Sequence, residues 1–412
     1  MTAIAAAAPA PTRADASGRL AGVDLARLVA IIGMMGAHTA LAWGNDTAAL
    51  RAVVDGPPST LFAVLGGASV VLAARGRLAR GERGRAVLAT LARGLLVALI
   101  GFLVIPLSPL IYVVLVPFGL AIALAAPLVI APSWAIGALL AALAALGGSA
   151  LVWARQALPV LETGTSHSPE TLVAAPAATL SNIVLTGVYP ALTWLTYLLV
   201  GMLAIRWLLR SRERGSERRT LGWLAAIGAA ALAAATVATE LAVRALGPVE
   251  LPGGDDLWHD VLLQNGYGAI REPGALWQLL AAPHSGTVAD VLRTAGIALV
   301  VIALLGLLVR ALPQPAMRAI GPLRAAGAAP LTIYVAHVLG VAVLATVAQT
   351  TGALWVGEGL GAWALHVAIA LAIGVVLWAA RSRGPLERGI GWVVDRVVPA
   401  GASPGASARA SA

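Results

Sequence analysis

Three ionisable side chains occur within an otherwise apolar stretch near the start of the chain, GVDLARLVAIIGMMGAH at residues 22–38. Asp24 precedes Arg27 by three positions, and His38 follows Arg27 by eleven. On a helix the three side chains share one face within about 60°, and Arg27 and His38 lie about 16 Å apart along the axis. An imidazole can act as a general base or as a nucleophile, and a guanidinium binds phosphate or carboxylate oxygens. Asp24, Arg27 and His38 are therefore the first candidates for a functional site.

A structural interpretation of the same residues stays open. Asp24 and Arg27 could pair locally in the first helical turn, where the helix dipole favours an acid. His38 could be an interfacial histidine bonded to a neighbouring carbonyl. Ionisable groups at membrane depth each cost about 2.5–3.5 kcal/mol and usually face the protein interior for functional reasons. For the three residues together we favour a function.

The elements that position these residues are expected to be membrane helices. The 412 residues are 59% hydrophobic and only 11% charged, whereas a soluble domain carries about 25% charged residues. Since a helix needs roughly 20 apolar residues to span the hydrocarbon core, we predict an all-α polytopic integral membrane protein with about ten transmembrane helices. The expected spans lie near residues 22–43, 59–75, 86–105, 109–130, 133–153, 189–208, 220–242, 290–310, 326–349 and 360–381.

The distribution of arginines predicts the orientation of these helices. Arginines gather in residues 75–85, 206–219, 310–324 and 381–396, which fall on one face of a ten-helix arrangement. The positive-inside rule makes that face cytoplasmic and places both termini there. The net charge of +9 is then a consequence of topology, and we expect no nucleic-acid partner. We predict a multi-pass protein of the plasma membrane, surrounded by lipid; a homo-oligomer is compatible with the sequence.

The two tails and the outer loops carry fewer signals. Residues 1–18 and 398–412 are expected to be disordered around a single transmembrane domain at 19–397. The outer loop GGDDLWHD (253–260) holds acids and a histidine, but their spacing matches no metal template, and the chain has no cysteine, so we expect no metal. Three tryptophans fit an aromatic belt at the outer interface: Trp43, Trp194 and Trp258.

Further polar residues occur inside or beside the predicted helices. Arg93 could extend back to the inner interface or could join Arg27 in binding phosphates. Tyr334 and His337 lie one turn apart in LTIYVAHVLG, and both are candidates for supporting the catalytic residue or binding the donor. His337 is either a packing histidine bonded to another helix or a residue that faces His38 or the donor path.

Two more histidines have weaker signals. His366, in WALHVAIA, is expected to be a satisfied interior histidine. His284 precedes a helix start with capping residues Thr287 and Asp290. It is either an interfacial loop histidine or an acceptor-side residue on the outer face.

In this order the segments resemble a known family. The Asp24, Arg27 and His38 pattern is similar to the first helix of membrane acyltransferases, both the type-3 acyltransferases and the relatives of heparan-α-glucosaminide N-acetyltransferase. PPSTLFAVLGGASVVLAARGR (57–77) resembles the second core helix of the latter family. Other segments are similar to its bacterial branch: LTGVYPALTWLTYLLVGMLAIRWLL (185–209), PHSGTVADVL (283–292), PLTIYVAHVL (330–339) and RGPLER (383–388).

The resemblance implies acyl transfer across the membrane. An acyl-CoA, typically acetyl-CoA, would donate from the cytoplasmic side to a sugar amine or hydroxyl, such as that of a glycan, on the outer side. Eukaryotic members also carry a histidine in the loop after the first helix, whereas ALAWGNDTAALRAVVDGPPS (40–59) has none. That departure moves the catalytic assignment onto His38, with Asp24 and Arg27 positioning it or binding donor phosphates. The alternative function is a transporter of a small or lipid-linked solute whose path is lined by the same polar face. A third possibility is a non-catalytic membrane scaffold.

Overall fold

The computed structural model describes residues 20–40, 47–108, 110–161, 167–247, 262–399 and 401. The regular secondary structure within these ranges is helical and includes no strand, as predicted for an all-α protein. Nine helical stretches within them are long and apolar enough to cross a membrane, so the chain is a multi-pass membrane protein. The long helices are α1 (Ala21–Thr39), α3 (Pro57–Ala79), α4 (Arg83–Val104), α6 (Ser133–Ala157), α9 (Ala191–Glu213), α10 (Glu217–Leu246), α12 (Val288–Ala311), α15 (Pro330–Thr351) and α16 (Gly359–Ala379). The shorter ones are α2 (Ala48–Val54), α5 (Leu115–Ala125), α7 (Pro169–Ala174), α8 (Pro176–Ser181), α13 (Gln314–Ala319), α14 (Gly321–Gly327) and α17 (Pro385–Val397).

The helix predicted at 109–130 is present but shorter than expected. α5 begins at Leu115, and the apolar helical stretch continues to Val129. Residues 110–114 are not helical, and the N–H of Val114 donates to the hydroxyl of Tyr334 at 3.2 Å. Pro117 is tolerated because it lies in the first turn, where backbone N–H groups have no helical partner. This short helix and the nine long stretches account for the ten predicted segments.

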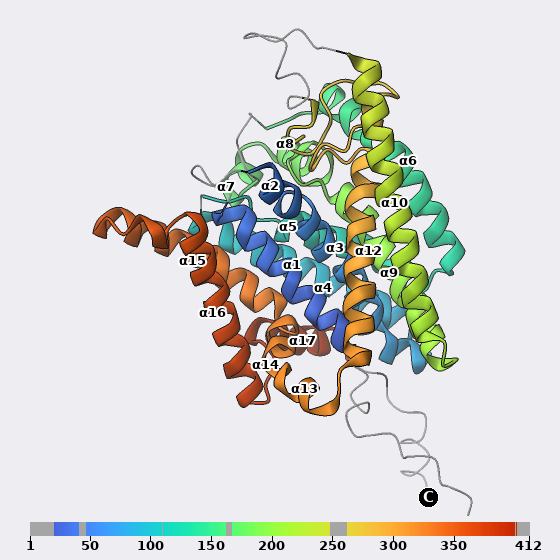
Figure 1. Ribbon diagram of the computed structural model, residues 1–412, viewed down its shortest axis with the longest axis vertical. Helices are drawn as coiled ribbons and strands as arrows, with labels where there is room; N and C mark the ends of the chain where they lie inside the picture. The colour runs from blue at the N-terminus through green and yellow to red at the C-terminus, as the bar shows by residue number, and fades with distance from the viewer. Residues whose placement is uncertain are drawn as a thin grey trace, which may run out of the picture.

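The centre of the bundle is formed by α1 and α3. In Figure 1, α10 and α12 run along one side of this pair, and α15 and α16 lie on the other. α3 and α9 approach closely, since a Cβ at Gly67 would clash with the carbonyl oxygen of Leu198 and one at Gly201 with that of Val64. Small residues that let backbones approach are the usual packing device of membrane helices. This packing fixes the face of α3 that borders the cavities described below.

The arginine-rich segments meet at one end of the bundle. Arg310 at the end of α12 pairs with Glu217 at the start of α10 at 2.5 Å. Arg77 of α3 pairs with Asp395 of α17 at 2.9 Å. α13, α14 and α17 lie at this end, whereas α2, α7 and α8 lie at the opposite one (Figure 1). We call these the inner and outer ends, and the positive-inside rule assigns the inner end to the cytoplasm.

One prediction about the tryptophans is wrong, and others fall outside the described residues. Trp194 is only 4% exposed and packs in the interior, with its ring centroid 5.4 Å from that of Phe118 and 6.4 Å from that of Tyr189. A tryptophan near the end of a helix looks the same in the sequence whether it lies in a lipid belt or in the core. The sequence therefore could not distinguish the two positions for Trp194. Trp43, the loop at 253–260 and most of both predicted tails lie outside the described residues.

Candidate functional site

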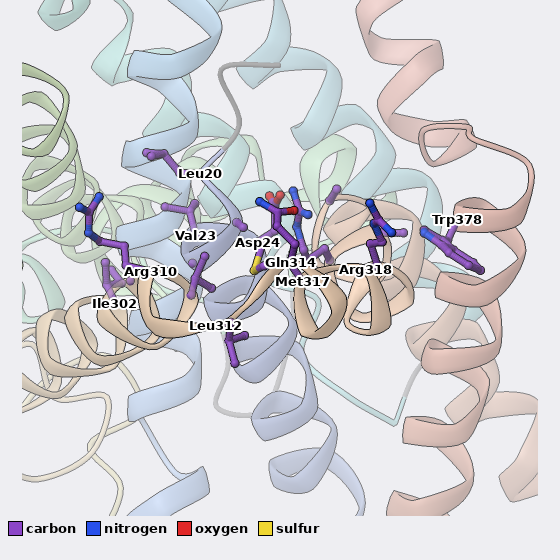
Figure 2. Close-up of a pocket in the computed structure, with 18 of the residues that line it drawn as sticks. Leu20, Val23, Asp24, Ile302, Arg310, Leu312, Gln314, Met317, Arg318 and Trp378 are labelled. Carbon is purple, nitrogen blue, oxygen red and sulfur yellow. The ribbon is translucent and has the colours of Figure 1, made fainter. Parts of the chain in front are cut away.

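A large cavity of about 1540 Å³ lies at the inner end of the bundle. Its walls come from the first turn of α1, the facing ends of α9, α10 and α12, the short helices α13 and α14, and the end of α16. Six arginines line it: Arg212, Arg310, Arg318, Arg324, Arg381 and Arg383. Figure 2 shows Arg310 and Arg318 on opposite sides of the cavity with Asp24 between them. The acids on its wall are Asp24 and Glu217, so arginines outnumber acids and the cavity favours an anionic ligand.

The predicted Asp24–Arg27 pair lies at the back of this cavity. Arg27 Nη1 is 2.7 Å from Asp24 Oδ1, and Arg27 Nη2 donates to Ser69 Oγ of α3 at 2.9 Å. Asp24 lines the large cavity, Arg27 lines a second one, and Ala328 lines both. The pair is therefore a local first-turn contact, as the structural interpretation expected, and it also separates two cavities.

The second cavity, of about 250 Å³, brings Arg27 and Arg93 together. Its remaining wall is largely apolar and includes Phe62 and Phe118, while Glu387 contributes from α17. The Glu387 carboxylate accepts hydrogen bonds from the backbone N–H groups at the start of α15, at 2.7 and 3.1 Å. Of the two interpretations of Arg93, this cavity fits the one in which Arg93 joins Arg27. Ser69 and Glu387, which also line it, give no such signal in the sequence. His38 is not part of the lining of this cavity.

His38, His337 and His366 form a hydrogen-bonded chain that joins α1, α15 and α16. His38 Nδ1 lies 3.0 Å from His337 Nε2, and His337 Nδ1 lies 3.1 Å from His366 Nδ1. The first two rings are nearly coplanar, with an interplanar angle of 7°, and the second two are nearly perpendicular at 81°. His337 and His366 are buried, and His38 is partly exposed. The structure thus places His337 against His38. His366 is an interior histidine, as expected, and its partner is His337.

The three imidazoles do not form a metal cage. His337 faces its two neighbours with different ring nitrogens, so the lone pairs of the three rings do not converge on one point. Within the part of the chain that the structure describes, no group of three or more histidine, cysteine, aspartate or glutamate residues could hold a metal ion.

Tyr334 packs near the wall of the second cavity and precedes His337 by one helical turn. It is buried, and its hydroxyl accepts the hydrogen bond from the N–H of Val114 at 3.2 Å. Its ring centroid lies 6.2 Å from that of Phe62, which lines the cavity, and His337 follows it by one helical turn. The hydroxyl of Tyr334 is thus engaged by the backbone, and its role as a supporting or donor-binding residue stays a prediction.

A second histidine centre lies at the outer end. His284 Nε2 is 3.1 Å from Asp55 Oδ1, and Asn265 Nδ2 donates to the same oxygen at 3.2 Å. The ring of Tyr189 meets that of His284 edge-on at a centroid distance of 5.0 Å. His284 has a φ of +56°, a left-handed conformation that is uncommon for residues other than glycine. Asp55 gave no signal in the sequence because its partner comes from a segment far along the chain.

Beside His284 there is a small pocket of about 20 Å³, the space of a single water molecule. Trp194, Tyr197 and Asp290 contribute to its wall. Thr287 caps α12 as predicted, since its hydroxyl accepts from the N–H of Asp290 at 3.1 Å. Asp290 is buried, its Oδ2 accepts from the N–H of Gly286 at 3.2 Å, and its Oδ1 lies 3.9 Å from Arg293 Nη2, so the carboxylate beside this pocket is already paired.

A comparison with protein families identifies the chain. The model of the catalytic domain of heparan-alpha-glucosaminide N-acetyltransferase matches residues 19–234. The chain belongs to this family. The match includes Asp24, Arg27, His38 and Arg93, and it ends within α10. No curated protein matches the chain. Membership makes the chain a transmembrane acetyltransferase-like protein. His284, His337 and His366 lie beyond the matched residues.

Proposed function

We propose that the protein moves an acyl group, most simply acetyl, from cytoplasmic acyl-CoA to a sugar amine or hydroxyl on the outer face of the plasma membrane. The observation that supports this most directly is the arginine-lined cavity of about 1540 Å³ at the inner end. Ligand pockets usually measure about 300–1,000 Å³, so there is room for a donor as large as CoA. Guanidinium groups suit the phosphates of such a donor.

The second cavity suits the other end of the donor. The phosphates of CoA would lie among the arginines of the large cavity, and its uncharged arm would pass the Asp24–Arg27 pair. The mostly apolar wall around Phe62 and Phe118 then accommodates the arm and acyl group. Arg93 and Arg27 remain close to any polar atoms of the arm. To reach His38, the acyl group would have to pass the ring of Phe62 and that of Tyr334, which packs near Phe62 at a centroid distance of 6.2 Å and precedes His337 by one helical turn.

His38 is the proposed catalytic residue, and two mechanisms remain. As a general base it would take the proton of the acceptor, which would then attack the thioester carbonyl. As a nucleophile it would carry the acyl group transiently and pass it to the acceptor. In both, the thiolate of CoA leaves and takes up a proton. On the acceptor side, His284 and the pocket beside it are the candidates for contact with the incoming amine or hydroxyl.

The decisive experiment uses purified protein in lipid nanodiscs, acetyl-CoA and a panel of amino sugars, and it follows the release of free CoA. We expect acceptor-dependent release that is lost in His38→Ala and kept in His167→Ala, a matched change of a histidine in an outer segment. Full activity of His38→Ala would remove His38 from the mechanism. Failure of the wild-type protein to bind acetyl-CoA would overturn the enzyme proposal.

The transporter alternative makes a different prediction for the same preparation. A transporter would move a solute across a sealed vesicle without releasing CoA, and Arg93→Gln would change transport in the absence of acetyl-CoA. An acyltransferase would instead show a higher KM for acetyl-CoA in Arg93→Gln, by about tenfold for the loss of one charge-assisted contact worth about 1.5 kcal/mol.

A further inference from the structure

The histidine chain links the protonation of three residues on three helices. A neutral imidazole has one N–H and one lone pair. His337 uses both nitrogens, one toward His38 and one toward His366, so it must donate to one neighbour and accept from the other. Both nitrogen–nitrogen distances, 3.0 and 3.1 Å, fall in the range of an N–H hydrogen bond. The tautomer of any one ring therefore fixes those of the other two.

Only two arrangements of the protons satisfy both hydrogen bonds. In the first, His38 Nδ1–H donates to His337 Nε2, and His337 Nδ1–H donates to His366 Nδ1. This leaves a lone pair on His38 Nε2. In the second, every donor and acceptor is exchanged, so His38 Nε2 carries a hydrogen and can neither take a proton nor attack a carbonyl. The two buried histidines thus decide whether His38 is chemically competent.

We propose that His337 and His366 are positioning residues that hold His38 in its Nδ1–H tautomer. The choice of this arrangement over the reversed one rests on the proposed function, because only the first leaves a lone pair on His38 Nε2 for a base or a nucleophile. His337 does for His38 what the acid does in a serine protease triad: it accepts the Nδ1–H and fixes the ring. Here the orienting group is a neutral imidazole whose own tautomer is set by His366.

The proton balance of a base-catalysed turnover closes within this arrangement. His38 Nε2 takes the proton of the acceptor amine or hydroxyl while its Nδ1–H stays bonded to His337. The acceptor forms its bond to the acyl carbon, and the carbon–sulfur bond of the thioester breaks. The proton on Nε2 then passes to the thiolate sulfur, which restores the starting tautomer. The positive charge that His38 carries in between is stabilised by the chain of two acceptors.

The tautomers of the three hydrogen-bonded histidines can be tested by nuclear magnetic resonance of ¹⁵N-histidine-labelled protein in nanodiscs. The six histidines of the sequence can be assigned with single variants. We expect His38 in the Nδ1–H form and couplings across both N–H···N bonds. His366→Phe should give His38 mixed tautomers. His366→Asn should keep the wild-type form, because its amide oxygen can take the place of Nδ1 and accept. His167 is not one of the three hydrogen-bonded histidines, so His167→Asn should leave the tautomer of His38 unchanged.

Kinetics give the second readout. His366→Phe should lower kcat about tenfold, since His38 then loses part of the roughly 10²–10⁴-fold contribution of a positioned base. The KM for acetyl-CoA should stay unchanged, and His366→Asn should restore most of kcat. His38 in the Nε2–H form in the wild-type protein, or the same His38 tautomer in His366→Phe, would overturn the proposal. If the wild-type protein transfers no acyl group, the proposed function fails, and the resonance experiment still decides the arrangement of protons.

Discussion

Removing one partner of the Asp24–Arg27 pair should cost more stability than neutralising both. Arg27 Nη1 is 2.7 Å from Asp24 Oδ1, and the two side chains are only 14% and 8% exposed. Removing one member of a buried ion pair costs about 3–5 kcal/mol, whereas replacing both members by apolar groups of similar volume is often close to neutral. Because some exposure remains, we expect Arg27→Gln and Asp24→Asn each to lose about 2 kcal/mol. Ser69 adds little to this loss, since its hydroxyl also bonds the carbonyl of Leu65 at 2.6 Å.

The double variant supplies the quantity that tests this reasoning. If it loses about 1.5 kcal/mol, the coupling between the two positions is about 2.5 kcal/mol, within the range for residues in direct contact. The four proteins can be compared by equilibrium unfolding in mixed micelles with increasing dodecyl sulfate, followed by tryptophan fluorescence. A double variant that loses the sum of the two single losses would refute the pair as a coupled, partly buried unit.

Three further outcomes follow from individual contacts. Tyr334→Phe should lower the unfolding free energy by about 1–3 kcal/mol, because the buried N–H of Val114 loses its acceptor, and it should leave the KM for acetyl-CoA unchanged. Glu387→Gln should speed amide hydrogen exchange at the start of α15, where two N–H groups bond the carboxylate, without changing exchange in α10. Burial lowers the pKa of His167, and its Nε2 has no partner, so the folded state opposes protonation. The unfolded state then binds more protons, so the protection factor of the outer segment at 167–186, which compares its exchange rate with the intrinsic rate at the same pH, should fall as the pH falls from 7.5 to about 5. His167→Phe should abolish that pH dependence.

The membrane architecture was predictable because hydropathy is a local property of the sequence. Spans of roughly 20 apolar residues and arginine-rich turns give the helices and their orientation without knowledge of any contact. The shortening of α5 was not predictable in this way. Hydropathy does not register Pro117, which fits the first turn of a helix, nor the hydrogen bond from the N–H of Val114 to the hydroxyl of Tyr334 on a distant segment.

The candidate site was predictable where charge stands out from an apolar background. Arg27 and Arg93 share a cavity because each is too costly in lipid and must face the interior, which the sequence already indicates. Asp55 gives no such signal, since an acid in a loop needs no explanation until His284 is found 3.1 Å away. His366 has the sequence context of a packing histidine, and its importance comes only from its contact with His337.

The candidate site residues come partly from the segment that matches the family and partly from the segment after it. The part that matches the family, residues 19–234, contains His38 and both arginines of the second cavity. The partners of His38 and Asp55 come from beyond the match, since His337 Nε2 lies 3.0 Å from His38 Nδ1 and His284 Nε2 lies 3.1 Å from Asp55 Oδ1. A histidine in a membrane helix has no water to satisfy its second nitrogen, so its tautomer is set by whichever protein group faces it. The matched segment can therefore supply the donor path and the position of His38, and the protonation state of His38 depends on α15 and α16.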